Sequence, residues 1–192
     1  MKKNSIYILV LFIGVALVFA FFDLSHTKET SDTKEEVRGI TFTPIGVERV
    51  EFGQPSGYSL YQRPRIEGSK TLGAAVFYEN TEANKMFFLG GKGIPQEAPT
   101  TITLDIYSNE KKVSLQELLK GDTSYPLITE TVKRVAIAGK DASYFEWDGL
   151  YRGRSVAIDH EGKTYIFSVT AMTQEDTILQ AFDAMLATIS FH

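Results

Sequence analysis

The chain contains no cysteine. Disulfide bonds, thiolate zinc sites and cysteine nucleophiles are therefore excluded, and so is a lipid-modified N-terminal cysteine. Only three histidines are present: His26, His160 and His192. A catalytic histidine needs an orienting partner and a nucleophile within hydrogen-bond reach. These three fall in a polar segment, a turn and the C-terminus, so we expect them to be solvated and not catalytic.

The motifs of common active sites are also missing. There is no Gly-x-Ser-x-Gly elbow, and Gly90–Gly93 lacks the spacing and the Ser or Thr of a phosphate loop. Asp159–Gly162 has too few oxygen ligands for calcium, and we predict a hairpin turn there. Two carboxylate pairs remain as candidates for sugar cleavage: Glu146 with Asp148, and Glu79 with Glu82. We predict no catalytic residue, no metal site and no cofactor.

The charge balance excludes another class of protein. The chain has 24 acidic and 20 basic residues and a net charge of −4. Proteins that bind nucleic acid normally carry a basic stripe, and none is visible here. No internal repeat of solenoid length occurs either. Nucleic acid is therefore not an expected partner.

One long hydrophobic run is present, from Ile6 to Phe22, and Lys2 and Lys3 precede it. As a helix it would be roughly 26 Å long, near the short limit for crossing a bilayer. Val18-Phe19-Ala20 also fits a signal-peptidase site, with cleavage after Ala20. The apolar residues that continue past Ala20 favour a retained single-pass anchor. Both interpretations place the N-terminus in the cytoplasm and the rest outside it, secreted if cleavage occurs.

The remaining chain divides into a polar stalk, residues 23–39, and one domain, residues 40–192. We expect the domain to begin with a strand at Ile40–Phe52. Further strands are predicted at Tyr58–Tyr61, Thr71–Tyr78 and Thr101–Tyr107. Ser114 and Glu117 form a capping box that predicts a short helix, Ser114–Lys120, ending at Gly121.

The last third of the domain organises it. Three strands are predicted at Thr131–Ala138, Ala142–Trp147 and Arg152–Ile158, and a fourth at Lys163–Thr170 alternates between apolar and polar residues. The strands follow one another as hairpins, so an antiparallel sheet is expected. A helix is predicted from Thr173, capped together with Asp176. Its apolar stripe should pack on Tyr165, Phe167 and Val169; the stripe comprises Ile178, Leu179, Phe182, Met185, Leu186 and Ile189.

The order of these elements resembles the PsbP-like fold family. The resemblance is carried by Gly57–Tyr61, by Thr101–Tyr107 before the short helix, by Ile137–Ala142 with its Gly-x-x-Ala turn, and by Thr188–Phe191 after the last helix. It covers roughly residues 40–192. The resemblance implies an α/β/α sandwich around an antiparallel sheet and no general enzymatic activity. The N-terminus resembles a bacterial anchor and not a thylakoid transit segment, and no functional residue is carried over.

We predict an α+β domain that is tethered to the membrane and binds or scaffolds a protein partner outside the cytoplasm. A small-ligand binding or carrier domain and an envelope hydrolase are the alternatives. The candidate binding residues are Tyr144, Arg152 and Arg154. Arg152 and Arg154 share one face of a strand, and a bulge at Gly153 would re-aim them. If the Asp-Gly turn closes a three-residue loop, Tyr144 lies opposite or diagonal to Arg152, and Arg and Tyr are enriched at binding hot spots. The alternative is a solvated hairpin whose arginines pair with Glu146 or Asp148.

Overall fold

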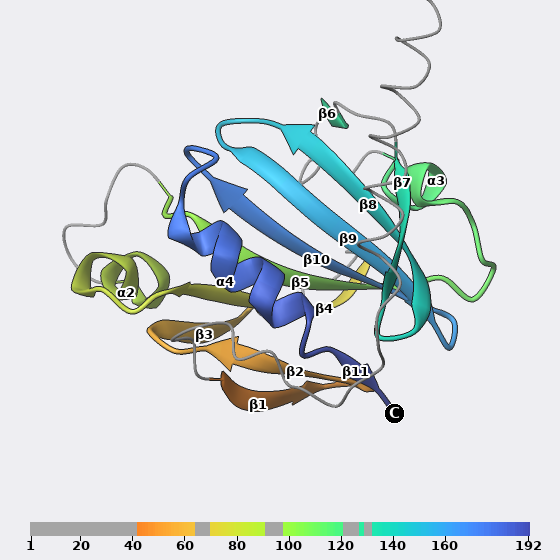
Figure 1. Cartoon of the computed structure of the whole chain (residues 1–192), viewed down its shortest axis with the longest axis horizontal. Coiled ribbons are helices and arrows are strands. Elements are labelled where there is room, and N and C mark those ends of the chain that lie inside the picture. The colour runs from red at the N-terminus through yellow and green to blue at the C-terminus, as the bar shows by residue number, and fades with distance from the viewer. Residues whose placement is uncertain (1–41, 64–69, 91–97, 121–126, 129–131) are drawn as a thin grey trace, which may run out of the picture. The chain divides into compact units, whose positions relative to one another are not determined.

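The computed structural model describes residues 42–63, 70–90, 98–120, 127–128 and 132–192 (Figure 1). Its strands are β1 (Phe42–Val47), β2 (Val50–Pro55), β3 (Tyr58–Arg63), β4 (Thr71–Glu79), β5 (Thr101–Ser108), β6 (Leu127–Ile128), β7 (Lys133–Ile137), β8 (Lys140–Asp148), β9 (Arg152–His160), β10 (Lys163–Ala171) and β11 (Ser190–Phe191). Its helices are α2 (Glu82–Leu89), α3 (Leu115–Leu118) and α4 (Thr177–Leu186).

Within these residues the strands form two sheets. The large sheet has eight strands in the order β3-β4-β5-β10-β9-β8-β6, and β7 pairs with β8 beside this path. The small sheet has the order β1-β2-β11. Every pairing between described strands is antiparallel, which confirms the predicted antiparallel sheet. The small sheet was not predicted, because its last strand pairs only Ser190 and Phe191 with β2.

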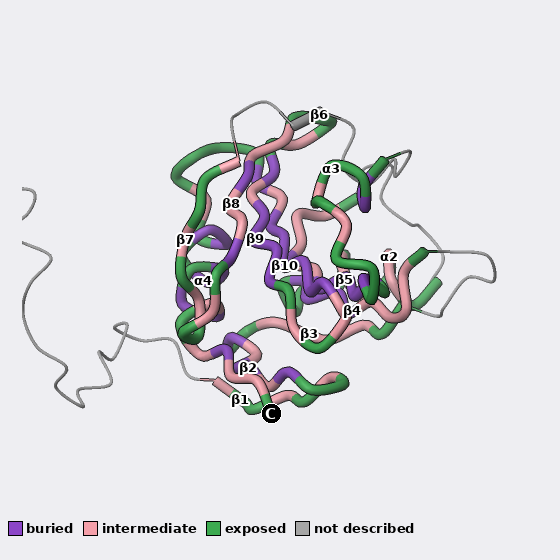
Figure 2. The backbone as a smooth tube through the Cα atoms, turned by 90° about the vertical axis from the view of Figure 1, so that its right-hand side faces the viewer, coloured by how far each residue is buried: buried purple, intermediate pink, exposed green. Residues whose placement is uncertain are grey.

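The first face of the large sheet carries the main core. Tyr165, Phe167 and Val169 are fully buried there, and α4 packs across them as its stripe predicts. Phe52 of β2 joins the same core, with its ring edge against Phe167 at 5.5 Å between centroids. Figure 2 shows the buried residues concentrated along the central strands, while β1 and β7 are more exposed. Burial of this apolar face is the largest stabilising contribution to the domain.

The second face is covered by shorter helices. Leu118 and Leu119, at the end of α3, pack on a cluster that contains Phe145 and Ile166. Nearer the β3 edge, Phe88 of α2 stacks on Tyr78, with ring centroids 4.4 Å apart. The Ser114 hydroxyl caps α3 by accepting from the Glu117 amide, as predicted. Helices therefore lie on both faces of the antiparallel sheet.

Two hairpin turns lie where turn residues in the sequence mark them. β7 and β8 are joined by Ala138 and Gly139, with φ of 51° and 70°, and β9 and β10 by Glu161 and Gly162, with φ of 46° and 75°. Positive φ at both central residues gives a turn whose twist matches that of the strands. The predicted turn at Asp159–Gly162 is thus confirmed, with Glu161 paired to Arg49.

The opening strand was predicted wrongly. In place of one strand through Phe52, β1 and β2 form a hairpin that reverses at Glu48 and Arg49, where Glu48 has a φ of 57°. No Gly, Pro, Asn or Asp marks this turn, which is why the sequence pattern gave no sign of it.

No helix was predicted between the strands Thr71–Tyr78 and Thr101–Tyr107. The structure has α2 there, whose N-cap Thr81 accepts a hydrogen bond from the Asn84 amide at 3.2 Å. Gly90 ends the helix with a φ of 75°. The helix has only eight residues and none of them is fully buried. Its apolar periodicity was therefore too weak to identify the segment as a helix.

The start of α4 differs from the prediction by four residues. Asp176, and not Thr173, occupies the N-cap position. Its carboxylate turns back instead, accepting from the Met172 and Thr173 amides at 2.7 and 3.1 Å and from the Thr173 hydroxyl. Thr173 and Asp176 therefore organise the loop before the helix.

No helix among the described residues is long and apolar enough to span a membrane. The predicted anchor (residues 6–22), the stalk (23–39), most of the glycine loop (91–97) and the helix end at Gly121 lie outside the described residues.

Candidate functional site

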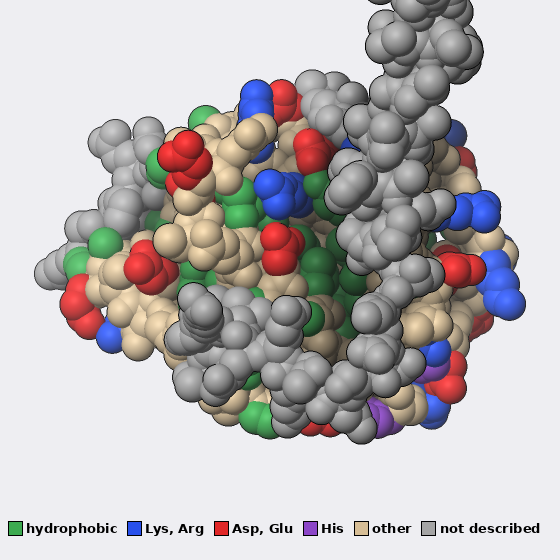
Figure 3. Space-filling view, in the orientation of Figure 1, with side chains coloured by type: hydrophobic (Ala, Val, Ile, Leu, Met, Phe, Trp, Pro, Cys, Tyr) green, Lys and Arg blue, Asp and Glu red, His purple; other side chains and the backbone are tan. Residues whose placement is uncertain are grey.

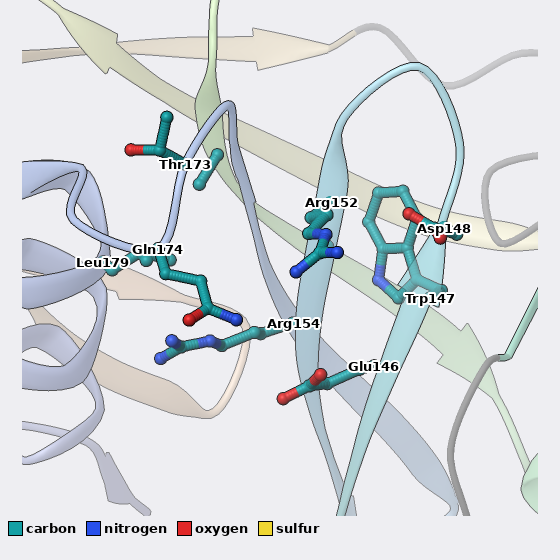
Figure 4. Close-up of a pocket in the computed structure, with 10 residues that line it drawn as sticks. Glu146, Trp147, Asp148, Arg152, Arg154, Thr173, Gln174 and Leu179 are labelled. Carbon is teal, nitrogen blue, oxygen red and sulfur yellow. The ribbon is translucent and has the colours of Figure 1, made fainter.

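A pocket of about 320 Å³ opens on the first face, between the ends of β8 and β9 and the loop that leads into α4 (Figure 4). Arg152 and Arg154 both line it, together with Glu146 and Asp148 from the neighbouring strand. Its other residues are Trp147, Gly153, Ala171, Thr173, Gln174 and Leu179. The structure thus brings both predicted arginines to one pocket.

The strand pattern explains this placement. Along β9, Arg152 and Arg154 lie on the same face as Val156 and Ile158, as predicted by their alternate spacing. Val156 and Ile158 are buried in the main core beneath α4. Arg152 is exposed, and Arg154 is half-buried because it lies beside α4, where its guanidinium is 4.0 Å from the Asp183 carboxylate (Figure 4). One face of β9 therefore passes from core to pocket.

The arginines are not bound tightly to their cross-strand neighbours. The register sets Arg154 opposite Glu146 and Arg152 opposite Asp148. The ion pair of Arg154, however, is with Asp183 of α4, at 4.0 Å. Arg152 forms no ion pair or side-chain hydrogen bond with any other described residue. Its guanidinium group remains available to a ligand, and Figure 3 shows charges of both signs interspersed over this side of the molecule.

Asp183 responds to two opposing influences. Partial burial raises the pKa of its carboxyl group, and the Arg154 guanidinium lowers it. The Asp183 side chain is 65% exposed, so solvent screens the pair. We therefore assign the Arg154–Asp183 contact a role in orienting Arg154 and not a large contribution to stability.

The predicted bulge at Gly153 is wrong. The pairing of β9 with β8 and with β10 runs through Gly153 without a shift in register. A Cβ atom at this position would lie 2.0 Å from Cε2 of Trp147, so the glycine makes room for the indole ring. The indole nitrogen donates to the Ser155 hydroxyl at 2.8 Å. Gly153 thus allows the indole of Trp147 to pack closely on the second face of the sheet.

The predicted place of Tyr144 is also wrong. Tyr144 lies opposite Val156, four residues along β9 from Arg152, and packs against the main core. Its hydroxyl donates to the Glu146 carboxylate, and the Lys133 ammonium lies 5.8 Å from its ring centroid. Tyr144 therefore orients a pocket residue without lining the pocket.

Two exposed apolar side chains beside this pocket were missed by the sequence reasoning. Leu150, in the β8–β9 loop, is 83% exposed, and Met172, before α4, is 62% exposed. Both line an adjoining hollow of about 340 Å³ that also includes Asp148 and Arg152. A leucine placed next to an Asp-Gly turn, where polar residues are usual, was the available signal. We call Leu150, Met172, Arg152 and Arg154 the hairpin-end surface.

The other candidates from the sequence lie elsewhere. His160 packs on Phe191 at 4.8 Å, and His192 contacts Glu51 at 3.0 Å, so neither histidine is near the pocket. Of the two carboxylate pairs, Glu146 and Asp148 line the pocket, whereas Glu82 pairs with Lys85 at the start of α2.

Comparisons with known proteins give the fold. No family model matches the chain, and no curated protein matches it. The chain is similar to the solution structure of CyanoP, the cyanobacterial PsbP of Synechocystis sp. PCC 6803, with a TM-score of 0.52 and 12% identity. The match covers 84% of this chain and 98% of CyanoP. The fold is PsbP-like.

The predicted resemblance is therefore confirmed for the PsbP-like fold, and at 12% identity it extends to the fold alone. A crystal structure of a protein from Bacteroides thetaiotaomicron matches with a TM-score of 0.41 and 14% identity, over 74% of this chain and 45% of that one. That likeness is too low to support any argument.

Proposed function

We propose that this PsbP-like chain is a non-catalytic binding domain, tethered outside the cytoplasm by residues 6–22, that binds a protein partner through the hairpin-end surface. The observation that supports this most is the exposure of Leu150 and Met172 next to Arg152. Isolated exposed apolar residues are ordinary, but two that share a hollow with a free guanidinium group have the composition of a binding hot spot.

The alternatives have less support. The 320 Å³ pocket falls at the lower end of the range for small-ligand sites, but it is lined by both acidic and basic side chains and few apolar ones. A hydrolase would use Glu146 and Asp148, which come from the same strand and therefore do not face each other across the pocket. We therefore favour a protein partner.

In-cell photo-crosslinking tests the proposal. A photoreactive amino acid at Leu150 or Met172 of the full-length chain should yield one discrete adduct, identified by mass spectrometry. Lys111 is the matched control, because it is exposed and lies at the opposite end of the sheet from Leu150. Its neighbour Asn109 donates its amide hydrogen to Gly162 in the β9–β10 turn, which fixes this position. The adduct should be lost with Arg152→Glu and absent from Lys111. Equal crosslinking from Lys111, or an adduct insensitive to Arg152→Glu, would reject this surface.

A further inference from the structure

The second face of the sheet has polar residues where core residues would be expected. Ser155, Ser168 and Asp105 are 0%, 3% and 6% exposed. Ser155, Ser168 and Thr103 lie in one cross-strand row, whereas the next row on the first face contains Val156, Phe167 and Leu104. Burying polar groups costs free energy unless they are hydrogen-bonded. Ser155 and Ser168 meet this requirement by bonding to each other at 2.8 Å, so the sheet keeps a polar strip between the α3 cluster and the α2 aromatic cluster.

Thr103 and Ser168 of this row form the floor of a second pocket, of about 190 Å³. Four hydroxyl groups line it, from Thr101, Thr103, Ser168 and Thr170. At one side, Nη1 of Arg63 lies 3.8 Å from Oδ1 of Asp105, which is longer than a hydrogen bond. Arg63 and Asp105 lie in one row with Ala74 between them, and the small alanine leaves both groups facing the pocket. A donor group and an acceptor group are thus held side by side.

Trp147 forms another wall of this second pocket. Its ring lies across Gly153, and its nitrogen donates to Ser155, whose hydroxyl is 2.8 Å from that of Ser168. Because Ser168 lines the pocket, this chain of hydrogen bonds connects the indole to the pocket floor. Trp147 is the single tryptophan of the whole chain.

We propose that this second pocket binds a neutral sugar ring, as a monosaccharide or as one unit of a glycan. Adjacent sugar hydroxyls would donate to Asp105 and accept from Arg63, and the C–H face of the ring would contact the indole. An anion would be repelled by the Asp105 carboxylate and a cation by the Arg63 guanidinium. An apolar ligand would displace water from these polar side chains without offering them a hydrogen bond. A free amino acid would match the ion pair but not the four hydroxyls. This site is separate from the hairpin-end surface and goes beyond the proposed function.

Tryptophan fluorescence provides a direct test. The full-length chain, in a detergent without a sugar headgroup, is titrated with glucose, galactose, mannose and N-acetylglucosamine, and with glycine and serine as zwitterionic comparators. A ligand of about 12 heavy atoms should bind at roughly millimolar concentration, so the titration extends to about 20 mM. We expect at least one sugar to shift the emission with saturation, and the amino acids to have no effect.

Three variants locate the binding. Arg63→Ala should weaken the sugar response about tenfold, because a charge-assisted hydrogen bond is lost. Gln62→Ala is the matched control, an exposed neighbour on the same strand that faces away from the pocket, and should bind normally. Arg152→Ala should also bind normally, which excludes the first pocket, since Trp147 lines both. No response to any sugar, a response to amino acids alone, or a loss with Arg152→Ala in place of Arg63→Ala would overturn the proposal.

Discussion

Gly153 and Trp147 determine each other's place at the scale of single residues. The indole occupies the space where any other residue at 153 would carry its Cβ. The contacting atoms belong to a rigid ring whose nitrogen is hydrogen-bonded to the Ser155 hydroxyl. The ring therefore cannot move aside without losing this hydrogen bond. The glycine is therefore required for packing, and the backbone of β9 stays regular.

Gly153→Ala should accordingly destabilise the protein by about 1–3 kcal/mol, the usual cost of overpacking. It should also change the emission of the single tryptophan. Urea unfolding followed by fluorescence measures both effects. Gly46→Ala is the control, because a Cβ there meets nothing within 4 Å and Gly46 is also in a strand. Equal stability of the two variants would contradict the assigned role of Gly153.

Asp176 gives a residue-scale prediction on pH. Hydrogen bonds from the Thr173 hydroxyl, the Thr173 amide and the Met172 amide lower the pKa of its carboxyl group below the ordinary value for an aspartic acid. A carboxyl group whose pKa is lower in the folded state stabilises the protein above its unfolded pKa. That stabilisation is lost as the pH falls through the folded pKa.

Asp176→Asn should therefore lower the Tm at pH 7, and the difference from the parent protein should shrink as the pH falls below 3.8. Thermal unfolding at several pH values measures it. Glu175→Gln, at the exposed position next to it, serves as the control for removing one negative charge. A difference that is constant with pH would show that the carboxylate does not organise this loop.

At the scale of the elements, α4 joins the two sheets. Its buried side chains pack on β10 and β5 of the large sheet and on β2 of the small one. Thr188, just after the helix, accepts from the Gly53 amide at 2.7 Å. The helix therefore holds the unpredicted small sheet against the first face.

Phe182 lies in the middle of the apolar stripe of α4 and is 1% exposed. Phe182→Ala should lower the free energy of unfolding by about 3–5 kcal/mol, as expected for a buried phenylalanine. Gln180→Ala, on the exposed side of the same helix, should change it by less than about 0.5 kcal/mol. Chemical denaturation of both variants measures the difference. A cost below about 1 kcal/mol for Phe182→Ala would mean that the helix does not dock firmly.

At the scale of the whole molecule, the two faces of the sheet carry different features. The first face ends in the hairpin-end surface, and the second holds the polar pocket. The strands between them are rigidly paired, and the two pockets share only Trp147. Variants at Arg152 and Arg63 should therefore act on separate binding events.

The predicted topology concerns the whole chain as well. With Lys2 and Lys3 in the cytoplasm and residues 6–22 as the anchor, the PsbP-like domain should face outward. Protease added to intact cells, after any wall is removed, should degrade the domain, while a cytoplasmic marker stays intact. Full protection of the domain would refute the orientation.

The sequence by itself determined the repeating local patterns. The alternation of apolar and polar residues predicted strand β10, and the alternate spacing of Arg152 and Arg154 predicted their shared face. Helical spacing predicted the apolar stripe of α4. The order of the elements predicted the PsbP-like fold. These patterns are readable because each depends on residues close together in the chain and on burial of one face.

Only the tertiary structure decided the features that depend on distant residues. The space for Trp147 over Gly153, the position of Tyr144 opposite Val156, and the pairing of β11 with β2 all arise from strand register and from contacts across the sheets. The pocket that Arg63 and Asp105 line likewise joins strands that are far apart in sequence. Register fixes which side chains meet, and a one-residue change would turn each of them to the opposite face. That is why the residues of both pockets could be assembled only from the folded chain.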